Sequence, residues 1–189
     1  MQSLFLVFLL LLTPLLSNGC GHPLSAADLY HGQVVDEETG QPLVGAAVTV
    51  IWYKAPVVHL ASPRYFQSAQ ETVTDSQGKF ELLVSPGFDW NPFTFIIDEP
   101  TIIIYQPGYE PVHATSLLRM GFKSYTEFAA ALEKGFVVKL LKLKTDKELR
   151  YYSGADVHPD VPYEQIPKLI QIINVHRKNL GLPPIGLVK

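Results

Sequence analysis

The chain has 189 residues, of which 47% are hydrophobic and 17% are charged, and its formal net charge is −3. A chain of this length is long enough for one domain with a buried core. Because 15 basic and 18 acidic side chains nearly cancel, the charge gives no electrostatic basis for binding nucleic acid. The fifteen prolines and thirteen glycines imply many turns, and we therefore expect a mainly β fold.

The first residues of the chain, 1–19, have the composition of a secretory signal peptide. Residues 4–16 are almost wholly apolar, and no charged side chain occurs before Asp28. Such a run is shorter than the about 20 residues that a membrane-spanning helix needs. It fits the apolar centre of a signal for export. We therefore expect residues 1–19 to be removed and residues 20–29 to form a tether.

Cys20 is the only cysteine in the chain and directly follows this signal. The segment LLSNGCG, residues 15–21, resembles the signal of bacterial lipoproteins, in which the cysteine becomes the lipidated first residue of the mature protein. One position departs from that pattern, because Ser17 stands where those signals usually have leucine. The resemblance implies fatty acylation of Cys20, for example with palmitate, and anchorage to a membrane of the bacterial cell envelope.

Two further features bear on where such a protein would reside. Lipoproteins kept in the inner membrane commonly have aspartate directly after the cysteine, whereas this chain has Gly21. That difference favours the outer membrane. The residues also leave open a soluble secreted or periplasmic protein that is cut after Gly19, because Ser17 and Gly19 satisfy the small-residue rule of ordinary signal cleavage.

Six segments are rich in β-branched and apolar residues and are predicted as strands. They are Tyr30–Asp36, Ala46–Tyr53, Gln70–Thr74, Lys79–Val84, Thr101–Tyr105 and Phe136–Leu143. Between the first two, Gly40 is expected to adopt the positive φ of a tight turn. The segment from Asp75 to Gly78 has the composition of a hairpin turn between the third and fourth strands. In the last strand the alternation breaks near Leu140, which predicts a bulge or a covered edge.

Two segments are predicted as helices. Ser124–Lys134 begins with a serine cap and has Glu127 three residues later. Pro167–Leu180 has proline at its first position and Gly181 beyond its end. We expect the second helix to dock on the β body, because one of its faces collects the apolar side chains of Ile166, Leu169, Ile170, Ile173 and Leu180.

Three motifs occur in order along the chain: GQVVDEETGQPLVGAAV from Gly32, TVTDSQGKFEL from Thr72, and PGYEP from Pro107. Together they resemble the carboxypeptidase regulatory-like domain. The resemblance covers about residues 30–143 and implies a transthyretin-like, seven-stranded Greek-key β-sandwich with a short inserted helix. A helical C-terminal extension, residues 144–189, would pack on it. Gly45 is expected to let two backbone segments approach closely, while Val48, Val50 and Phe80 face the core.

We expect neither enzymatic activity nor a metal or other cofactor. Zinc carboxypeptidases use a histidine followed three residues later by glutamate, because the metal needs ligands that are preset on one local scaffold. None of the six histidines here has glutamate at that offset. The terminal Tyr-Arg-Gly-Ser of the hydroxyisourate hydrolases, which share the transthyretin-like fold, is replaced by Gly-Leu-Val-Lys.

An aromatic loop, residues 85–100, is the candidate surface for a ligand or partner. Its candidate residues, together with one from the neighbouring insertion, are Phe88, Asp89, Trp90, Asn91, Phe93 and Tyr65. Exposed rings beside amides and carboxylates bind sugars or partner proteins. The alternative is that these rings pack beneath their own loop.

The sequence thus predicts a non-enzymatic structural or interaction module of the cell envelope, held at the membrane by its lipid. Its expected partner is an envelope protein or a glycan. The alternative is a sugar- or peptide-binding lipoprotein that uses the aromatic loop.

Overall fold

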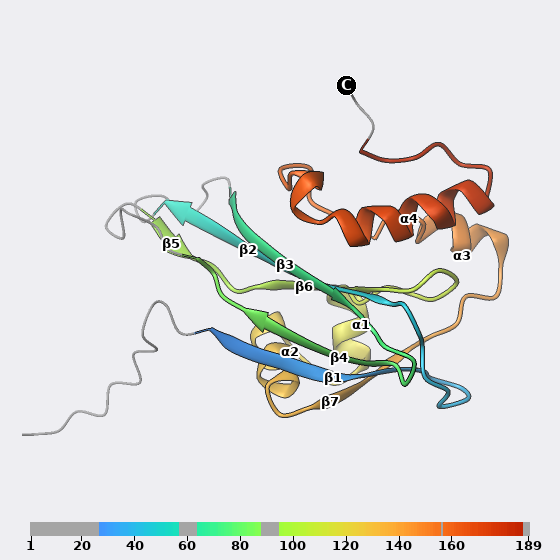
Figure 1. Cartoon of the computed structure of the whole chain (residues 1–189), viewed down its shortest axis with the longest axis horizontal. Helices are drawn as coiled ribbons and strands as arrows, with labels where there is room; N and C mark the ends of the chain where they lie inside the picture. The colour runs from blue at the N-terminus through green and yellow to red at the C-terminus, as the bar shows by residue number, and fades with distance from the viewer. Residues whose placement is uncertain (1–26, 57–63, 88–94, 156, 187–189) are drawn as a thin grey trace, which may run out of the picture.

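The computed structural model describes residues 27–56, 64–87, 95–155 and 157–186 (Figure 1). This part of the chain is mainly β, as the composition predicts. One sheet has the strand order β4-β1-β7, and in the other β2 pairs with β3, β5 and β6. The strands are β1 (Asp28–Asp36), β2 (Ala47–Pro56), β3 (Tyr65–Val73), β4 (Lys79–Val84), β5 (Phe95–Ile97), β6 (Thr101–Tyr105) and β7 (Phe136–Leu140).

The helices lie in two groups. The first pair, α1 (Ala114–Arg119) and α2 (Tyr125–Leu132), connects β6 to β7. The second group follows β7 and consists of α3 (Asp146–Tyr151), a 3-10 turn η1 (Tyr163–Gln165) and α4 (Pro167–Asn179). No helix in the described ranges is long and apolar enough to cross a membrane.

The two sheets and the first helix pair enclose one hydrophobic core. Val48 and Val50 of β2 are fully buried there, and Phe80 of β4 is 4% exposed. These three positions are confirmed as predicted core residues. Phe128 of α2 also belongs to this core and packs against Phe122 and Phe136 with ring centroids 5.2 and 6.2 Å away. The helix pair therefore completes the core where the sheets alone would leave it open.

The turn between β3 and β4 has the predicted local geometry but a different role. Gly78 has φ 71°, and the Asp75 carboxylate accepts hydrogen bonds from the amides of Gln77 and Lys79. However, β3 pairs with β2, whereas β4 pairs with β1. The predicted hairpin is therefore wrong: the turn carries the chain from one sheet to the other. Turn chemistry is local, whereas the choice of partner strand depends on core packing.

The turn after β1 also passes between the sheets. Gly40 has φ 69°, as expected, and the Asp36 carboxylate accepts hydrogen bonds from the amides of Glu38 and Thr39. The bond from Thr39 is the largest cause of a lowered pKa at Asp36. The expectation for Gly45 needs correction, because nothing lies within 4 Å of the place where its Cβ would be. Glycine is suited to that position by its φ of 77° and not by a close approach.

Several element boundaries differ from the predictions. β1 begins at Asp28, inside the predicted tether, and β7 ends at Leu140. Beyond it, Lys142 forms an isolated bridge with Tyr109, so the broken alternation marks the end of the strand and a change of partner. The helix predicted at Ser124–Lys134 is confirmed as α2, and Ser124 is its cap. The short helix α1 was missed, because six residues carry too little periodicity to be recognised.

Helix α4 docks on the outer face of the second sheet, as predicted (Figure 1). Leu169 and Ile173 are fully buried against residues of β2 and β6 such as Ile51 and Ile103. One turn beyond Ile173, His176 is also buried, at 6% exposure. The C-terminal extension therefore has a second hydrophobic core of its own, on the opposite face of β2 from the first.

A buried polar pair lies within this second core. The Tyr105 hydroxyl is 2.5 Å from Nδ1 of His176. Burial lowers the pKa of His176 and raises that of Tyr105. The imidazole is therefore neutral at neutral pH, and the phenol donates the hydrogen bond to it. The bond satisfies two polar groups that would otherwise oppose docking of the helix.

The N-terminus of α4 receives its cap from a distant strand. Ile166, at the cap position, supplies no side-chain hydrogen bond. Instead, the carboxylate of Glu71 on β3 accepts hydrogen bonds from the amides of Lys168, at 2.6 Å, and Leu169, at 3.1 Å. A carboxylate at this end of a helix also interacts favourably with the helix dipole. Glu71 thus joins the C-terminal extension to the sheet.

Changing Glu71 to glutamine is expected to reduce stability by about 1–2 kcal/mol, because glutamine retains only one acceptor oxygen and no charge. The free energy of unfolding in urea measures this loss. Glu81→Gln, at an exposed position on β4, is the matched control and should leave stability unchanged within about 0.5 kcal/mol. Equal stability of both variants would show that the contact with Glu71 does not hold α4.

Candidate functional site

A groove runs along the side of the molecule where β6, the first helix pair and the C-terminal extension meet. It consists of two adjoining cavities, both lined by His113, Ala114 and Ala155. We call them the first and the second cavity. The extension contributes to both, so the groove exists only when the extension is docked on the sheet.

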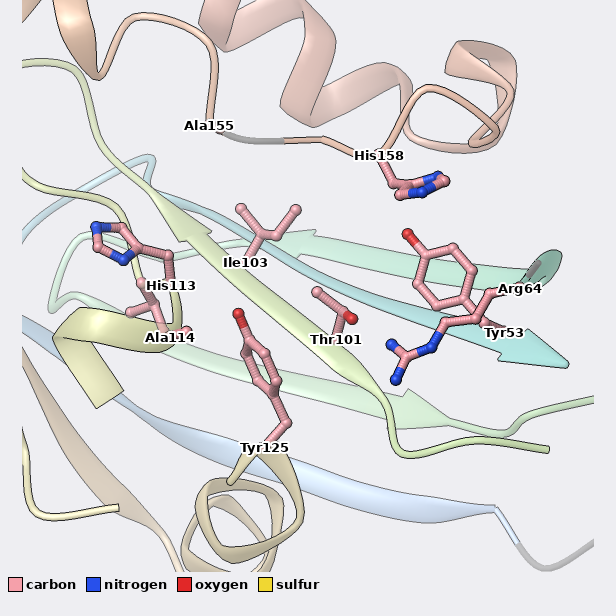
Figure 2. Close-up of a pocket in the computed structure, with 10 residues that line it drawn as sticks. Tyr53, Arg64, Thr101, Ile103, His113, Ala114, Tyr125, Ala155 and His158 are labelled. Atoms are coloured by element: carbon pink, nitrogen blue, oxygen red, sulfur yellow. The ribbon is translucent and has the colours of Figure 1, made fainter. Parts of the chain in front are cut away.

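The first cavity has a volume of about 210 Å³ (Figure 2). Its floor is formed by Thr101 and Ile103 of β6, and its upper rim by the segment that leads to α4. Its remaining lining residues are Tyr53, Arg64, Val112, His113, Ala114, Tyr125, Ala155 and His158. Figure 2 shows the hydroxyl end of Tyr125 rising from α2 toward Thr101 and Ile103.

The second cavity has a volume of about 600 Å³ and lies beyond His113. Its lining is about equally polar and apolar, and its two tyrosines follow one another in the chain. Tyr151 is 79% exposed, and its ring packs edge-on against Tyr152 at 4.9 Å. The cavity's other lining residues are Pro111, Thr115, Gly154 and Val157. An elongated ligand can therefore contact both cavities at once.

Each basic side chain of the first cavity is accompanied by a carboxylate. Arg64 Nε is 2.8 Å from Asp98, His158 Nδ1 is 3.6 Å from Asp160, and His113 Nε2 is 3.4 Å from Glu110. None of these three carboxylates is among the residues that line the cavity. They orient the basic groups, while the lining itself presents hydrogen-bond donors and aromatic faces.

His113 is held between the two cavities by three contacts. Its Nδ1 accepts a hydrogen bond from the Thr115 amide at 3.2 Å as part of the α1 cap. In the neutral ring the proton therefore resides on Nε2, on the side of Glu110. The imidazole also stacks on Tyr152, with an interplanar angle of 14°. The position of His113 is thus set by the helix cap and the extension together.

Glu110 is the centre of a polar network behind the groove. It is only 8% exposed, and it accepts a hydrogen bond from Arg119 at 3.0 Å. Arg119 also pairs with Glu37, in the turn after β1. The pKa of the Tyr152 hydroxyl is raised, first by burial and then by the charge of Glu110. This network connects the PGYEP motif to the first turn, so the wall of the groove is built on the core of the domain.

Tyr53 contributes a hydroxyl that keeps its proton. Its side chain is 4% exposed, and burial raises the pKa of Tyr53 to about 12, an effect that the charge of Arg64 partly offsets. Its ring meets His158 edge-on, with centroids 5.8 Å apart. At neutral pH this phenol is therefore a hydrogen-bond donor at the margin of the cavity.

Comparison with known proteins identifies no relative from which a role could be transferred. No protein-family model matches the chain, and no curated protein matches it. Among solved structures, the chain is similar to a 9R-lipoxygenase from Cyanothece PCC8801, with 18% identity and a TM-score of 0.27. The similarity covers 49% of this chain and 13% of the lipoxygenase. A likeness at that score carries no argument about fold or activity.

Most of the functional residues that the sequence predicts fall outside the described ranges. These are Cys20 and the aromatic residues and neighbours Phe88, Asp89, Trp90, Asn91 and Phe93. Tyr65 is described: it begins β3, is 46% exposed and lines neither cavity of the groove. In the described ranges, no group of three or more His, Cys, Asp and Glu side chains is placed to hold a metal ion.

The sequence did not predict that the residues of the groove form a site. Tyr53 was assigned only to a strand, Tyr125 only to a helix, and Arg64 to no element. The one available signal was the PGYEP motif, because it places Glu110 and Pro111 directly before His113. Nothing in the local pattern indicates that these residues meet His158 from the extension, since they are brought together by the docking of α4.

Proposed function

We propose that this protein is a non-enzymatic interaction module of the bacterial cell envelope that binds an extended ligand in the groove. The observation that carries this proposal is the pair of adjoining cavities, which share a wall and are lined by tyrosine, histidine and arginine side chains. Aromatic faces combined with hydrogen-bond donors suit a sugar chain or a peptide.

The engagement of the groove's polar groups favours binding over catalysis. The Ser116 hydroxyl, on the helix that borders the groove, is buried and donates within the α1 cap to the carbonyl oxygens of Pro111 and His113. Nδ1 of His113 accepts a hydrogen bond from the Thr115 amide, and Nε2 lies 3.4 Å from Glu110 without forming a hydrogen bond. These groups serve the structure of the groove wall, which holds the remaining donors in place for a ligand.

We also propose that the domain is a carboxypeptidase regulatory-like module with the transthyretin-like, seven-stranded Greek-key arrangement. Supporting this, each of the three motifs contains a glycine with positive φ: Gly40 at 69°, Gly78 at 71° and Gly108 at 86°. Tyr109 of the third motif donates a hydrogen bond to Asp36 of the first, at 2.9 Å. The motifs therefore act together in the fold, as expected for parts of one domain signature.

The same proposal places the domain near a membrane through lipidated Cys20, with the outer membrane favoured. Since β1 begins at Asp28, only residues 21–27 would separate the lipid from the first strand. Even fully extended, such a segment spans at most about 25 Å. The groove would thus act on envelope components close to the membrane surface.

Ala114→Trp tests the groove. Ala114 is exposed, begins α1 and lines both cavities, so an indole there should obstruct ligand binding with little effect on stability. We expect the purified wild-type protein to bind members of a glycan or peptide array and Ala114→Trp to lose that binding at least about tenfold.

Leu118→Trp is the matched control, because Leu118 is 65% exposed on the same helix and lines neither cavity. This variant should bind like the wild type, and melting curves should show that both variants fold. If Ala114→Trp binds the same array members as the wild type with equal affinity, the groove is not the binding site and the proposal fails.

A further inference from the structure

We infer that the first cavity binds a carboxylate group of the ligand while the rest of the ligand lies in the second cavity. This inference rests on the proposed function and specifies the chemistry of its ligand. It follows from three features of the first cavity: the kind of polar groups that line it, its charge balance and its size.

The polar groups of the lining are predominantly hydrogen-bond donors. Arg64 uses Nε for Asp98, and its two terminal nitrogens remain for a planar acceptor such as a carboxylate. Figure 2 shows this guanidinium group next to Tyr53 and turned toward Thr101. The protonated hydroxyl of Tyr53 adds a further donor at the same margin. Among the residues that the structure describes, no aspartate or glutamate lines the cavity to repel an anion.

The charge balance favours a ligand with a single negative charge. The charge of Arg64 is partly compensated by Asp98, whose side chain is 29% exposed, and that of protonated His158 would be compensated by Asp160. A dianion such as phosphate would therefore leave more uncompensated negative charge in this partly enclosed site than a carboxylate would. A carboxylate also matches the flat, two-pronged geometry of the guanidinium group.

The size of the first cavity limits what it can enclose. Its volume of about 210 Å³ is below the range of about 300–1,000 Å³ that is typical for drug-sized ligands. It is sufficient for one terminal group. The second cavity, about 600 Å³ in volume, begins at the shared residues His113, Ala114 and Ala155 and offers the rings of Tyr151 and Tyr152. The ligand is thus an acid with a larger, partly apolar body.

Paired probes, of which one carries a carboxylate and the other a neutral group in its place, test this inference. N-acetylleucine is compared with N-acetylleucinamide, and glucuronic acid with glucose, by calorimetric titration of the full mature protein. We expect the acid of at least one pair to bind about tenfold or more tightly than its neutral partner. The pair that shows the difference distinguishes a peptide carboxylate from an acidic sugar.

Two variants test whether the preference for the acid arises in the first cavity. Arg64→Gln and Tyr53→Phe should each reduce the affinity for the acid about tenfold without changing that for the neutral probe. Tyr53→Phe preserves the buried ring, so it still tests the carboxylate assignment even if Arg64→Gln disturbs the fold. Arg150→Gln, in α3 and outside both cavities, controls for the general loss of a positive charge.

The outcomes separate the inference from the proposed function. Equal affinity for acid and neutral probes, full acid binding by both variants, or stronger binding of inorganic phosphate would overturn the carboxylate assignment. Array binding that depends on Ala114 would then still support the groove. A protein whose array binding does not respond to Ala114→Trp would refute the proposed function itself.

Discussion

Replacing Ile173 with aspartate is expected to lower the free energy of unfolding by about 3–5 kcal/mol. Ile173 is fully buried between α4 and the second sheet, where it packs in a cluster with Ile51, Ile103 and Leu169. A carboxylate at this position would lose its hydration, because the cluster around it consists of hydrophobic side chains. Urea denaturation measures the loss, and hydrogen exchange of the α4 amides shows whether the helix detaches.

Val175→Asp is the matched control, since Val175 lies on the same helix and is 54% exposed. It introduces the same charge and the same cost in helix propensity but no buried carboxylate. Ile170, which is only partly buried against the same cluster, should give an intermediate loss. Wild-type stability of Ile173→Asp would mean that α4 does not dock in solution. The groove would then also be lost, because Ala155 and His158 reach it only through the docked extension.

Replacing Cys20 with serine is expected to abolish membrane anchorage. If the thiol of Cys20 is the site of acylation, the wild-type protein should incorporate labelled palmitate and sediment with membranes. The serine variant should do neither and should accumulate as an unprocessed precursor, because the lipoprotein peptidase cleaves only after the cysteine is modified. A triacylated terminus buries many methylenes at about 0.8 kcal/mol each, so the difference in membrane partition should be close to complete.

Ser17→Leu is the companion variant, because it restores the residue that lipoprotein signals usually have three positions before the cysteine. It should be processed at least as efficiently as the wild type. Soluble, unlipidated wild-type protein that begins at Cys20 or Gly21 would contradict the anchor and favour a secreted or periplasmic protein. Binding by the groove does not depend on this result, since the described domain begins at residue 27.

Local features of the fold could be predicted from the sequence. The strands Lys79–Val84 and Thr101–Tyr105 occur at the predicted residues, and α2 begins after its predicted Ser124 cap. Gly40 and Gly78 have the positive φ that their turns require. All of these depend on propensities and hydrogen bonds within a few residues, which a short stretch of sequence contains in full.

The pairing of strands and the groove could not be predicted in this way. The turn at Asp75–Gly78 is compatible with a hairpin and with a crossing between sheets, and only the packing of Phe80 and Val48 into a common core selects the crossing. The cap that Glu71 provides for α4 and the bond between Tyr105 and His176 join residues about a hundred and about seventy positions apart, respectively. No local pattern contains such pairs.

The sequence by itself determined the mainly β character, the turns and the helix caps of this protein, together with an apolar face on the last helix. These are short-range properties, governed by backbone conformation and by side-chain periodicity. Only the tertiary structure decided which sheet each strand joins, that α4 covers the outer face of β2 and β6, and that Tyr53, Arg64, His113 and His158 surround one cavity. Those arrangements arise because burial of apolar surface is non-directional, so they depend on how all elements pack at once.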